Sequence, residues 1–214
     1  MKEHLLVIYP HPDDEAFSCS GTIASYTSKG HPVTYVCMTL GQMGRNMGNP
    51  MFANRETLPT IRKKELETAC ESLGITDLRM WGMHDKMVEF EDDEQLAARI
   101  KAVIDEIDPS LIITFYPGYG VHPDHDACGA AVVQAVGMLP EDKRPPVHCV
   151  AVAKNTVEKL GQPDIVVDVS EFSQQKIAAI SAHQSQFHAQ IKMAEKDKQM
   201  RERIMTERFW IYKF

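Results

Sequence analysis

The chain has 214 residues, 43% of them hydrophobic, and a formal net charge of −7. This composition predicts one soluble α/β domain over residues 1–214 with a sizeable core. Because phosphates repel an acidic chain, neither nucleic acid nor a membrane surface is expected as a partner. We find no signal-peptide core and no apolar run of the ~20 residues that a membrane span needs. Five cysteines without a Cys-x-x-Cys pair suit reduced thiols, so we expect a cytoplasmic protein.

Short apolar runs alternate with helix-like segments along the chain. Strands are predicted at residues 5–9, 33–40, 77–81, 111–116, 147–153 and 165–169. Helices are predicted at residues 16–29, 59–73, 94–107 and 124–138. Strands that alternate with helices of this length imply βαβ units, so we expect a mostly parallel sheet.

The remaining segments are less regular. Glycines and a proline predict a loop over residues 41–54, and its three evenly spaced methionines suit an adaptable lid better than a methionine metal site. Residues 170–205 are predicted to be mostly helical, with a break near residues 183–188. The apolar tail of residues 209–212 is expected to dock on the body of the protein or on another subunit, and we expect a homo-oligomer.

Ligand-capable side chains follow the first predicted strand in the run His11-Pro12-Asp13-Asp14-Glu15. In open α/β sheets, ligands bind outside the carboxyl ends of the strands. A dinucleotide-binding fold carries Gly-x-Gly-x-x-Gly at this point, where the glycines let the backbone approach a pyrophosphate. The present run is too bulky and too acidic for a phosphate, which favours a cation.

A second run, His122-Pro123-Asp124-His125, follows the strand predicted at residues 111–116. The first and last residues of this run, like His11 and Asp14, are three apart, a spacing that puts both side chains on one side of a turn. Two imidazoles and a carboxylate would leave a divalent metal with open positions, as in catalytic zinc sites. Asp13 and Asp124 remain available to act as a base or to orient a histidine. The structural alternative is that Asp13 and Asp14 cap the following helix.

These motifs resemble those of the PIG-L/LmbE-like family of metal-dependent N-acetylglucosaminyl deacetylases. The resemblance covers most of the chain and rests on six segments, namely residues 10–15, 39–41, 62–66, 82–85, 122–125 and 182–186. It implies a Rossmann-like, three-layer fold. In its details the chain is most similar to the branch that removes the acetyl group from N-acetylglucosaminyl-malate in bacillithiol synthesis.

The resemblance also implies a role for each residue of the two motifs. Zn²⁺, or another divalent metal such as Fe²⁺, would be held by His11, Asp14 and His125. Asp13 would be the general base that takes a proton from the attacking water. His122 would protonate the leaving amine or stabilise the oxyanion, and Asp124 would orient His122. The chain departs from its relatives at Gly120, where they often carry a tyrosine, so Tyr119 is given no role.

The expected substrate is a small amino sugar. By resemblance, Arg62 and Asp85 fall at sugar-contacting positions. If the aglycone is malate, its two carboxylates need cationic partners, because arginine offers a planar, two-pronged donor. Arg45, Arg55 and Arg62 lie in or near the loop that follows the second strand, and they are the candidates.

Three other functions use the same residues. Two of them are enzymatic: an amidase that acts on a bacillithiol S-conjugate, and a deacetylase of another N-acetylglucosaminide. The third is a metal-binding regulatory or nucleotide-sensing module of Rossmann type. A binding module needs metal ligands but no additional base, so the role of Asp13 distinguishes it from the enzymes.

Overall fold

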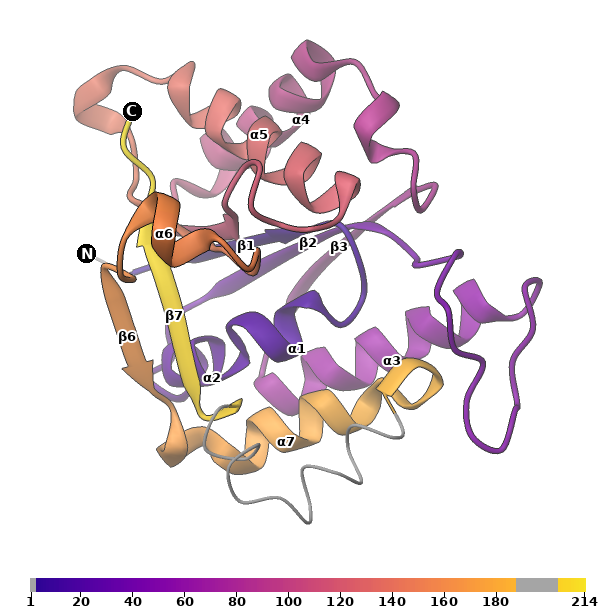
Figure 1. The fold of residues 1–214 in the computed structure, drawn as a ribbon. Coiled ribbons are helices and arrows are strands. Elements are labelled where there is room, and N and C mark those ends of the chain that lie inside the picture. Colours follow the sequence, from indigo (N-terminus) through magenta and orange to yellow (C-terminus); the bar gives the residue numbers. More distant parts are fainter. Residues whose placement is uncertain (1–2, 188–203) are drawn as a thin grey trace.

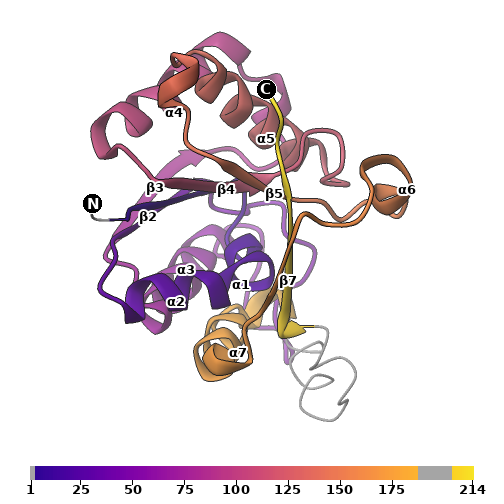
Figure 2. The same ribbon diagram turned by 90° about the vertical axis from the view of Figure 1, so that its left-hand side faces the viewer.

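The computed structural model describes residues 3–187 and 204–214. A seven-stranded sheet runs through its centre in the order β3-β2-β1-β4-β5-β7-β6 (Figures 1 and 2). The strands are β1 (Leu5–Tyr9), β2 (Val33–Thr39), β3 (Asp77–Met83), β4 (Leu111–Phe115), β5 (Val147–Val150), β6 (Ile165–Asp168) and β7 (Thr206–Ile211). The first five strands in this order pair in parallel, whereas β7 is antiparallel to both of its neighbours. The expected α/β fold with a mostly parallel sheet is therefore confirmed.

Helices cover both faces of the sheet and make three layers (Figure 1). The helices are α1 (Asp14–Ser18), α2 (Ser20–Ser28), α3 (Leu58–Leu73), α4 (Asp93–Ile107), α5 (Pro123–Gly137), α6 (Thr156–Leu160) and α7 (Ser173–Ala182), with short 3-10 helices η1 (Val88–Phe90), η2 (Glu141–Lys143) and η3 (Ser170–Phe172). α4 and α5 pack on one face, and α1, α2, α3 and α7 on the other. Because helices bury both faces, β1 and β2 are buried at every residue, as is typical of parallel sheets.

The helix predicted over residues 16–29 is two helices, with a break at Cys19, where φ is −149°. The carboxylate of Glu207 accepts hydrogen bonds from the amides of Gly21 and Thr22 at 2.8 and 2.9 Å, which satisfies free donors at the start of α2. Glu207 also forms a buried ion pair with Lys176 at 2.6 Å. The sequence could not reveal this break, because the carboxylate that starts the second helix comes from a distant strand.

The apolar tail docks on the body of the protein as strand β7, between β5 and β6. Of the two expected docking partners, the body is therefore the one used in this structure. α7 ends at Ala182, and His183 leaves the helical conformation with ψ at 53°, which confirms the predicted break. The rest of the predicted helix, residues 188–203, lies outside the described residues.

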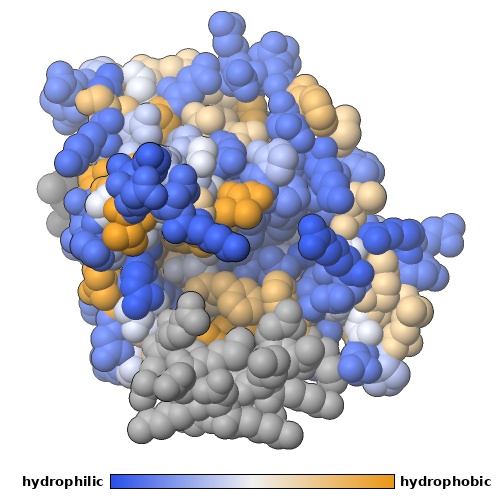
Figure 3. Space-filling model, in the orientation of Figure 1, coloured by the Kyte–Doolittle hydropathy of each residue, from blue (hydrophilic) through white to orange (hydrophobic). Residues whose placement is uncertain are grey.

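Two further expectations from the sequence can be compared with the structure. All five cysteines are buried and unpaired. Within residues 3–187 and 204–214, no helix combines the length and the apolar character that crossing a membrane requires. The face of the molecule in Figure 3 is mostly hydrophilic, and its apolar residues form a few separate patches.

Candidate metal centre and active site

The two sequence motifs meet because the strands before them are neighbours. β1 and β4 pair in parallel, with Leu5 opposite Leu111, so their carboxyl ends reach the same edge of the sheet. From β1 the chain continues to β2 on one side, whereas β4 lies on the other side of β1. A crevice at such a change of direction is where α/β folds bind ligands. The motif after β1 and the motif after β4 thus face each other.

Three side chains from the motifs approach one another about as closely as the ligands of one metal ion. His11 Nδ1 is 3.1 Å from His125 Nε2, His125 Nε2 is 3.3 Å from Asp14 Oδ1, and His11 Nδ1 is 3.5 Å from Asp14 Oδ2. A tetrahedral zinc ion with bonds of about 2.0–2.2 Å holds its ligand atoms roughly 3.3–3.6 Å apart. The donor set expected from the sequence therefore fits a divalent metal.

The second nitrogen of each of these histidines is held by an oxygen acceptor. His11 Nε2 lies 3.1 Å from Asp124 Oδ2 and 3.2 Å from Asp85 Oδ1, while His125 Nδ1 lies 2.9 Å from the carbonyl oxygen of Gly120. Metal-binding histidines usually bond in this way through the nitrogen that does not face the metal. The arrangement leaves His11 Nδ1 and His125 Nε2 to face a metal.

Two other groups of side chains around His11 also satisfy the distances of a metal site. One contains His11, His122 and His125, and the other contains His11, Asp85 and Asp124. In the second group both carboxylates already accept backbone amides, from Met43 to Asp85 at 2.8 Å and from Lys86 to Asp124 at 2.7 Å. We favour the site that includes Asp14, because it uses the nitrogens of His11 and His125 that their oxygen acceptors leave free.

Asp13 lies beside the donor set in a strained backbone conformation, with φ at 105°. It occupies the N-cap position of α1 but forms no side-chain cap bond, so the capping alternative does not explain it. Its Oδ2 accepts a hydrogen bond from Arg62, whereas no described residue bonds to Oδ1. Burial raises the pKa of Asp13 to about 6, and the Arg62 guanidinium opposes this rise. A carboxylate with one free oxygen is thus available for proton transfer.

The pKa values of the donor set follow from burial and mutual contact. Burial disfavours the charged form of Asp14, but His125 and His11 outweigh it and hold the pKa of this carboxyl below its usual range. Burial also disfavours a charged His11, yet its bonds to Asp124, Asp14 and Asp85 raise the pKa of the imidazole. A buried carboxylate with two imidazoles is a stable arrangement of charge for this edge of the sheet.

The two remaining residues of the second motif differ in their contacts from the expectation. His122 is the N-cap residue of α5, and its Nδ1 accepts the amide of Asp124 at 3.1 Å. The carboxylate of Asp124 does not bond to His122; it bonds to His11 and to the amide of Lys86. Asp124 therefore contacts His122 through its backbone amide, while its carboxylate is engaged by His11. Burial, followed by the charges of His11 and His125, lowers the pKa of His122.

A cavity of about 340 Å³ opens above this cluster. Of the residues expected to touch the substrate, Arg45, Arg62 and Asp85 line it, but Arg55 does not. Arg55 donates instead to the carbonyl oxygens of Gln42 and Gly44 and so holds the loop backbone. Arg62 is buried, and its guanidinium binds Asp13 and the carbonyl oxygens of Pro12 and Gly41. Arg45 is exposed at the rim.

The sequence interpretation gave no role to Lys86, Glu15 and His183. Lys86 lines the cavity, as Arg45 does, and its φ is 67°. Its position in the sequence, between Asp85 and an apolar residue, did not indicate a role. Glu15 and His183 are fully buried and form an ion pair at 2.9 Å directly behind Asp13. Both residues lie in segments that carry the family resemblance, residues 10–15 and 182–186. The sequence did not reveal that the two side chains are in contact.

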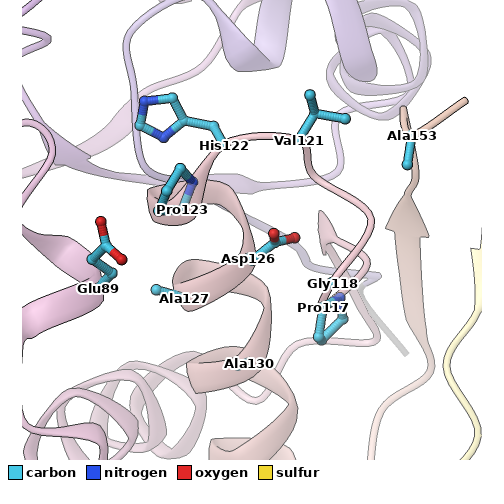
Figure 4. A pocket seen from close by; sticks show the side chains of 10 residues that line it. All are labelled: Glu89, Pro117, Gly118, Val121, His122, Pro123, Asp126, Ala127, Ala130 and Ala153. Atoms are coloured by element: carbon cyan, nitrogen blue, oxygen red, sulfur yellow. The ribbon is translucent and has the colours of Figure 1, made fainter.

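A second cavity, of about 650 Å³, adjoins the first at His122. Figure 4 shows that it lies along the first turns of α5, where Ala127 and Ala130 form its floor and Glu89 and Ala153 stand on opposite sides. Its walls are largely apolar.

Comparisons with known proteins identify the family of the chain. The sequence profile of the PIG-L family, described as GlcNAc-PI de-N-acetylase, matches residues 6–136. The chain belongs to the PIG-L family. Over the full length of both chains it is 53% identical to a probable N-acetyl-α-D-glucosaminyl L-malate deacetylase 2 of Bacillus cereus. The expected family is therefore confirmed, and so is the expected class of enzyme, a hydrolase that removes N-acetyl groups.

Two solved structures share the fold of this PIG-L protein. The N,N'-diacetylchitobiose deacetylase of Pyrococcus horikoshii has a TM-score of 0.75 and 24% sequence identity, and the match covers 98% of this chain and 84% of that one. The 4-carboxy-2-hydroxymuconate hydratase of Pseudomonas putida has a TM-score of 0.76 and 17% identity, with coverage of 99% and 97%. At these identities the likeness concerns the fold alone, and the second protein shows that one fold serves different reactions.

The position of Arg62 leads to a prediction about Gly41. Gly41 has φ at 62°, and a Cβ added there would lie 1.8 Å from Arg62 Nη1. Gly41→Ala should displace the guanidinium from Asp13 and lower kcat/KM by about 10²-fold, the cost of a misplaced catalytic group. Steady-state kinetics on an N-acetylated amino sugar measures this loss.

Gly30→Ala is the matched control for Gly41→Ala. Gly30 has φ at 75°, and a Cβ added there would have no atom within 4 Å. Both variants should lose about 1–2 kcal/mol of unfolding free energy in urea, because alanine disfavours the left-handed conformation. Only Gly41→Ala should lose activity, and equal kcat/KM in the two variants would refute the role of Arg62.

Proposed function

We propose that this PIG-L protein is a divalent-metal-dependent deacetylase that acts on N-acetylglucosaminyl L-malate. The observation that carries the proposal is the mutual approach of three side chains, His11, Asp14 and His125, each of which has an atom within 3.5 Å of each of the other two. The half-free carboxylate of Asp13 lies beside them. Imidazole and carboxylate donors suit Zn²⁺, our first choice, and also Fe²⁺. The substrate is supported by the name of the Bacillus cereus relative.

In this proposal His11, Asp14 and His125 hold the metal. When bound, a divalent metal supplies Lewis acidity, which activates water and polarises an amide carbonyl. Asp13 accepts the proton of the attacking water at Oδ1, because Arg62 occupies Oδ2. His122 lines the same cavity as Asp13 and faces the reacting amide. It donates a proton to the departing amine or a hydrogen bond to the oxyanion, and acetate and a free amino sugar are the products.

The malate end of the substrate brings two carboxylates to a cavity that already contains several aspartates. Of the four basic side chains discussed above, Arg55 and Arg62 bond to protein carbonyl oxygens, and Arg62 also to Asp13. Arg45 and Lys86 line the cavity from different loops, and neither forms an ion pair with a described residue. We therefore assign the carboxylates to Arg45 and Lys86. Asp85 and Arg62, which the resemblance implies as sugar contacts, line the cavity but already bond to protein groups.

Four broader expectations remain proposals. The parallel order β3-β2-β1-β4-β5 supports a Rossmann-like description of the fold, since it is the order of a doubly wound sheet. The five unpaired cysteines support a cytoplasmic location. One domain over residues 1–214 and a homo-oligomeric state also stay predictions.

The proposed activity is tested by acetate release from N-acetylglucosaminyl L-malate. We expect the protein as isolated to contain about one divalent metal ion per chain, because the ligand set holds a single ion. Chelation should abolish acetate release, and Zn²⁺ or Fe²⁺ should restore it. Metal analysis together with an acetate assay measures both. Full activity in protein that contains no metal would refute the proposal.

Asp13 and Asp14 are adjacent and chemically identical, but the proposal gives them different tasks. Asp14→Asn should weaken metal binding, so that added metal restores part of the activity. Asp13→Asn should keep the metal but lower kcat/KM by about 10²–10⁴-fold, the usual contribution of a general base. A metal titration of both variants distinguishes them. Loss of metal by Asp13→Asn and retention by Asp14→Asn would reverse the two roles.

The assignment of the carboxylates predicts a selective effect on KM. Arg45→Met and Lys86→Met should each raise KM for the malate conjugate about 10- to 100-fold, because each removes a charge-assisted hydrogen bond. KM for the methyl glycoside of N-acetylglucosamine should hardly change. Lys63→Met, on the exposed side of α3, is the control and should affect neither substrate. Equal effects on the two substrates would exclude carboxylate recognition by that residue.

A further inference from the structure

Asp13 needs support from its surroundings to keep its conformation. Its φ of 105° lies in a region that residues other than glycine rarely adopt, and such strain persists only where neighbouring groups hold it. Its side chain is held by Arg62 at one oxygen only. The backbone amide of Asp13 donates a hydrogen bond to Glu15 Oε2 at 3.1 Å, which fixes the peptide plane before the strained residue.

Glu15 is itself held on both oxygens by buried partners. Its Oε2 also accepts the hydroxyl of Tyr35, at 2.9 Å, and its Oε1 lies 2.9 Å from His183 Nε2. The side chains of Glu15 and His183 are 0% exposed, so water does not weaken the interaction between them. A buried ion pair contributes little to stability by itself, because desolvation offsets the attraction. Stability alone therefore does not account for this pair.

The ring of His183 has one hydrogen-bond partner among the described residues, Glu15. Its Nδ1 is buried and bonds to no described residue, so the ring is held through Nε2. His183 ends α7, and burial lowers its pKa while Glu15 raises it more strongly, giving a net rise. The ring thus serves chiefly to orient the Glu15 carboxylate under Asp13.

The turn that begins at His183 also reaches the opposite wall of the cavity. Ser185 donates to Glu65 through its amide and its hydroxyl, at 2.7 Å each. Gln186 and Asn46 exchange two hydrogen bonds of 2.8 and 2.7 Å, beside Arg45. One turn therefore supports Asp13 on one side and the loop with Arg45 on the other.

We infer that Glu15, oriented by His183, is a positioning residue that fixes the backbone of Asp13 and thereby aims its free carboxylate oxygen at the reacting amide. This inference rests on the proposed function, since it takes Asp13 as the base. It predicts that Glu15→Gln loses turnover rather than substrate binding, because the substrate does not touch Glu15.

The test compares Glu15→Gln with Glu207→Gln in the metal-loaded protein. Glu207 is the matched control, because it is also a buried glutamate with a buried cationic partner and lies outside the cavity. Glu15→Gln should lower kcat about 10²-fold with KM and metal content unchanged, as a shift of the base by about 1 Å would do. Glu207→Gln should keep kcat. Loss of metal in step with kcat would overturn the inference, because Glu15 would then be supporting Asp14.

Two substitutions of His183 keep the inference testable if Glu15→Gln fails to fold. His183→Gln retains a donor for Glu15 and should keep most of kcat, whereas His183→Leu should lose as much as Glu15→Gln. Equal kcat for the two would overturn the inference.

Hydrogen exchange over residues 10–16 gives a readout that needs no substrate. Exchange should be faster in Glu15→Gln and His183→Leu than in Glu207→Gln, and unchanged exchange would overturn the inference. A wild-type protein that releases no acetate but shows these exchange differences would overturn the proposed function and leave the positioning role standing.

Discussion

Acidic side chains crowd around one end of the sheet, and the cost of burying them governs the site. Asp14, Glu15, Asp85 and Asp124 are almost inaccessible to solvent, in a chain that is already acidic. A buried carboxylate is tolerated only with a charged or hydrogen-bonding partner. Here His11 serves Asp14, Asp85 and Asp124, and His183 serves Glu15. The basic residues below the cavity are thus committed to balancing charge, whereas Arg45 and Lys86, which also line it, form no ion pair with a described residue.

This division of the basic residues explains why two arginines near the cavity differ in burial and in bonding partners. Arg62 comes from α3 and is 3% exposed, with its guanidinium enclosed by Asp13 and two carbonyl oxygens. Arg45 comes from the loop after β2, is exposed, and forms no ion pair with any residue that the structure describes. A shared fold does not settle such differences, since a hydratase has the same fold at a TM-score of 0.76. The reaction follows from which side chains stand at the ends of β1 and β4.

The location of the site could be predicted from the sequence because it depends on local patterns. Apolar runs such as residues 5–9 mark buried parallel strands, and a polar run directly after one marks the carboxyl edge of the sheet. The choice among partners could not be predicted. The sequence placed Asp124 near His122, but in the structure its carboxylate bonds to His11. The break at Cys19, the pairing of β7 and the contact of Glu15 with His183 all depend on residues far apart in the chain, which local periodicity does not report.

The support that β7 gives to α2 has a consequence for how the protein is made. Gly21 and its partner Glu207 are 186 residues apart in the sequence. A ribosome therefore exposes both His/Asp motifs long before it delivers the carboxylate that starts the helix behind the first of them. Contacts between residues so far apart in the sequence slow down folding. The entropy cost of closing the intervening loop must be met before the contact can stabilise the fold. During synthesis, the proposed metal ligands precede the framework that fixes them.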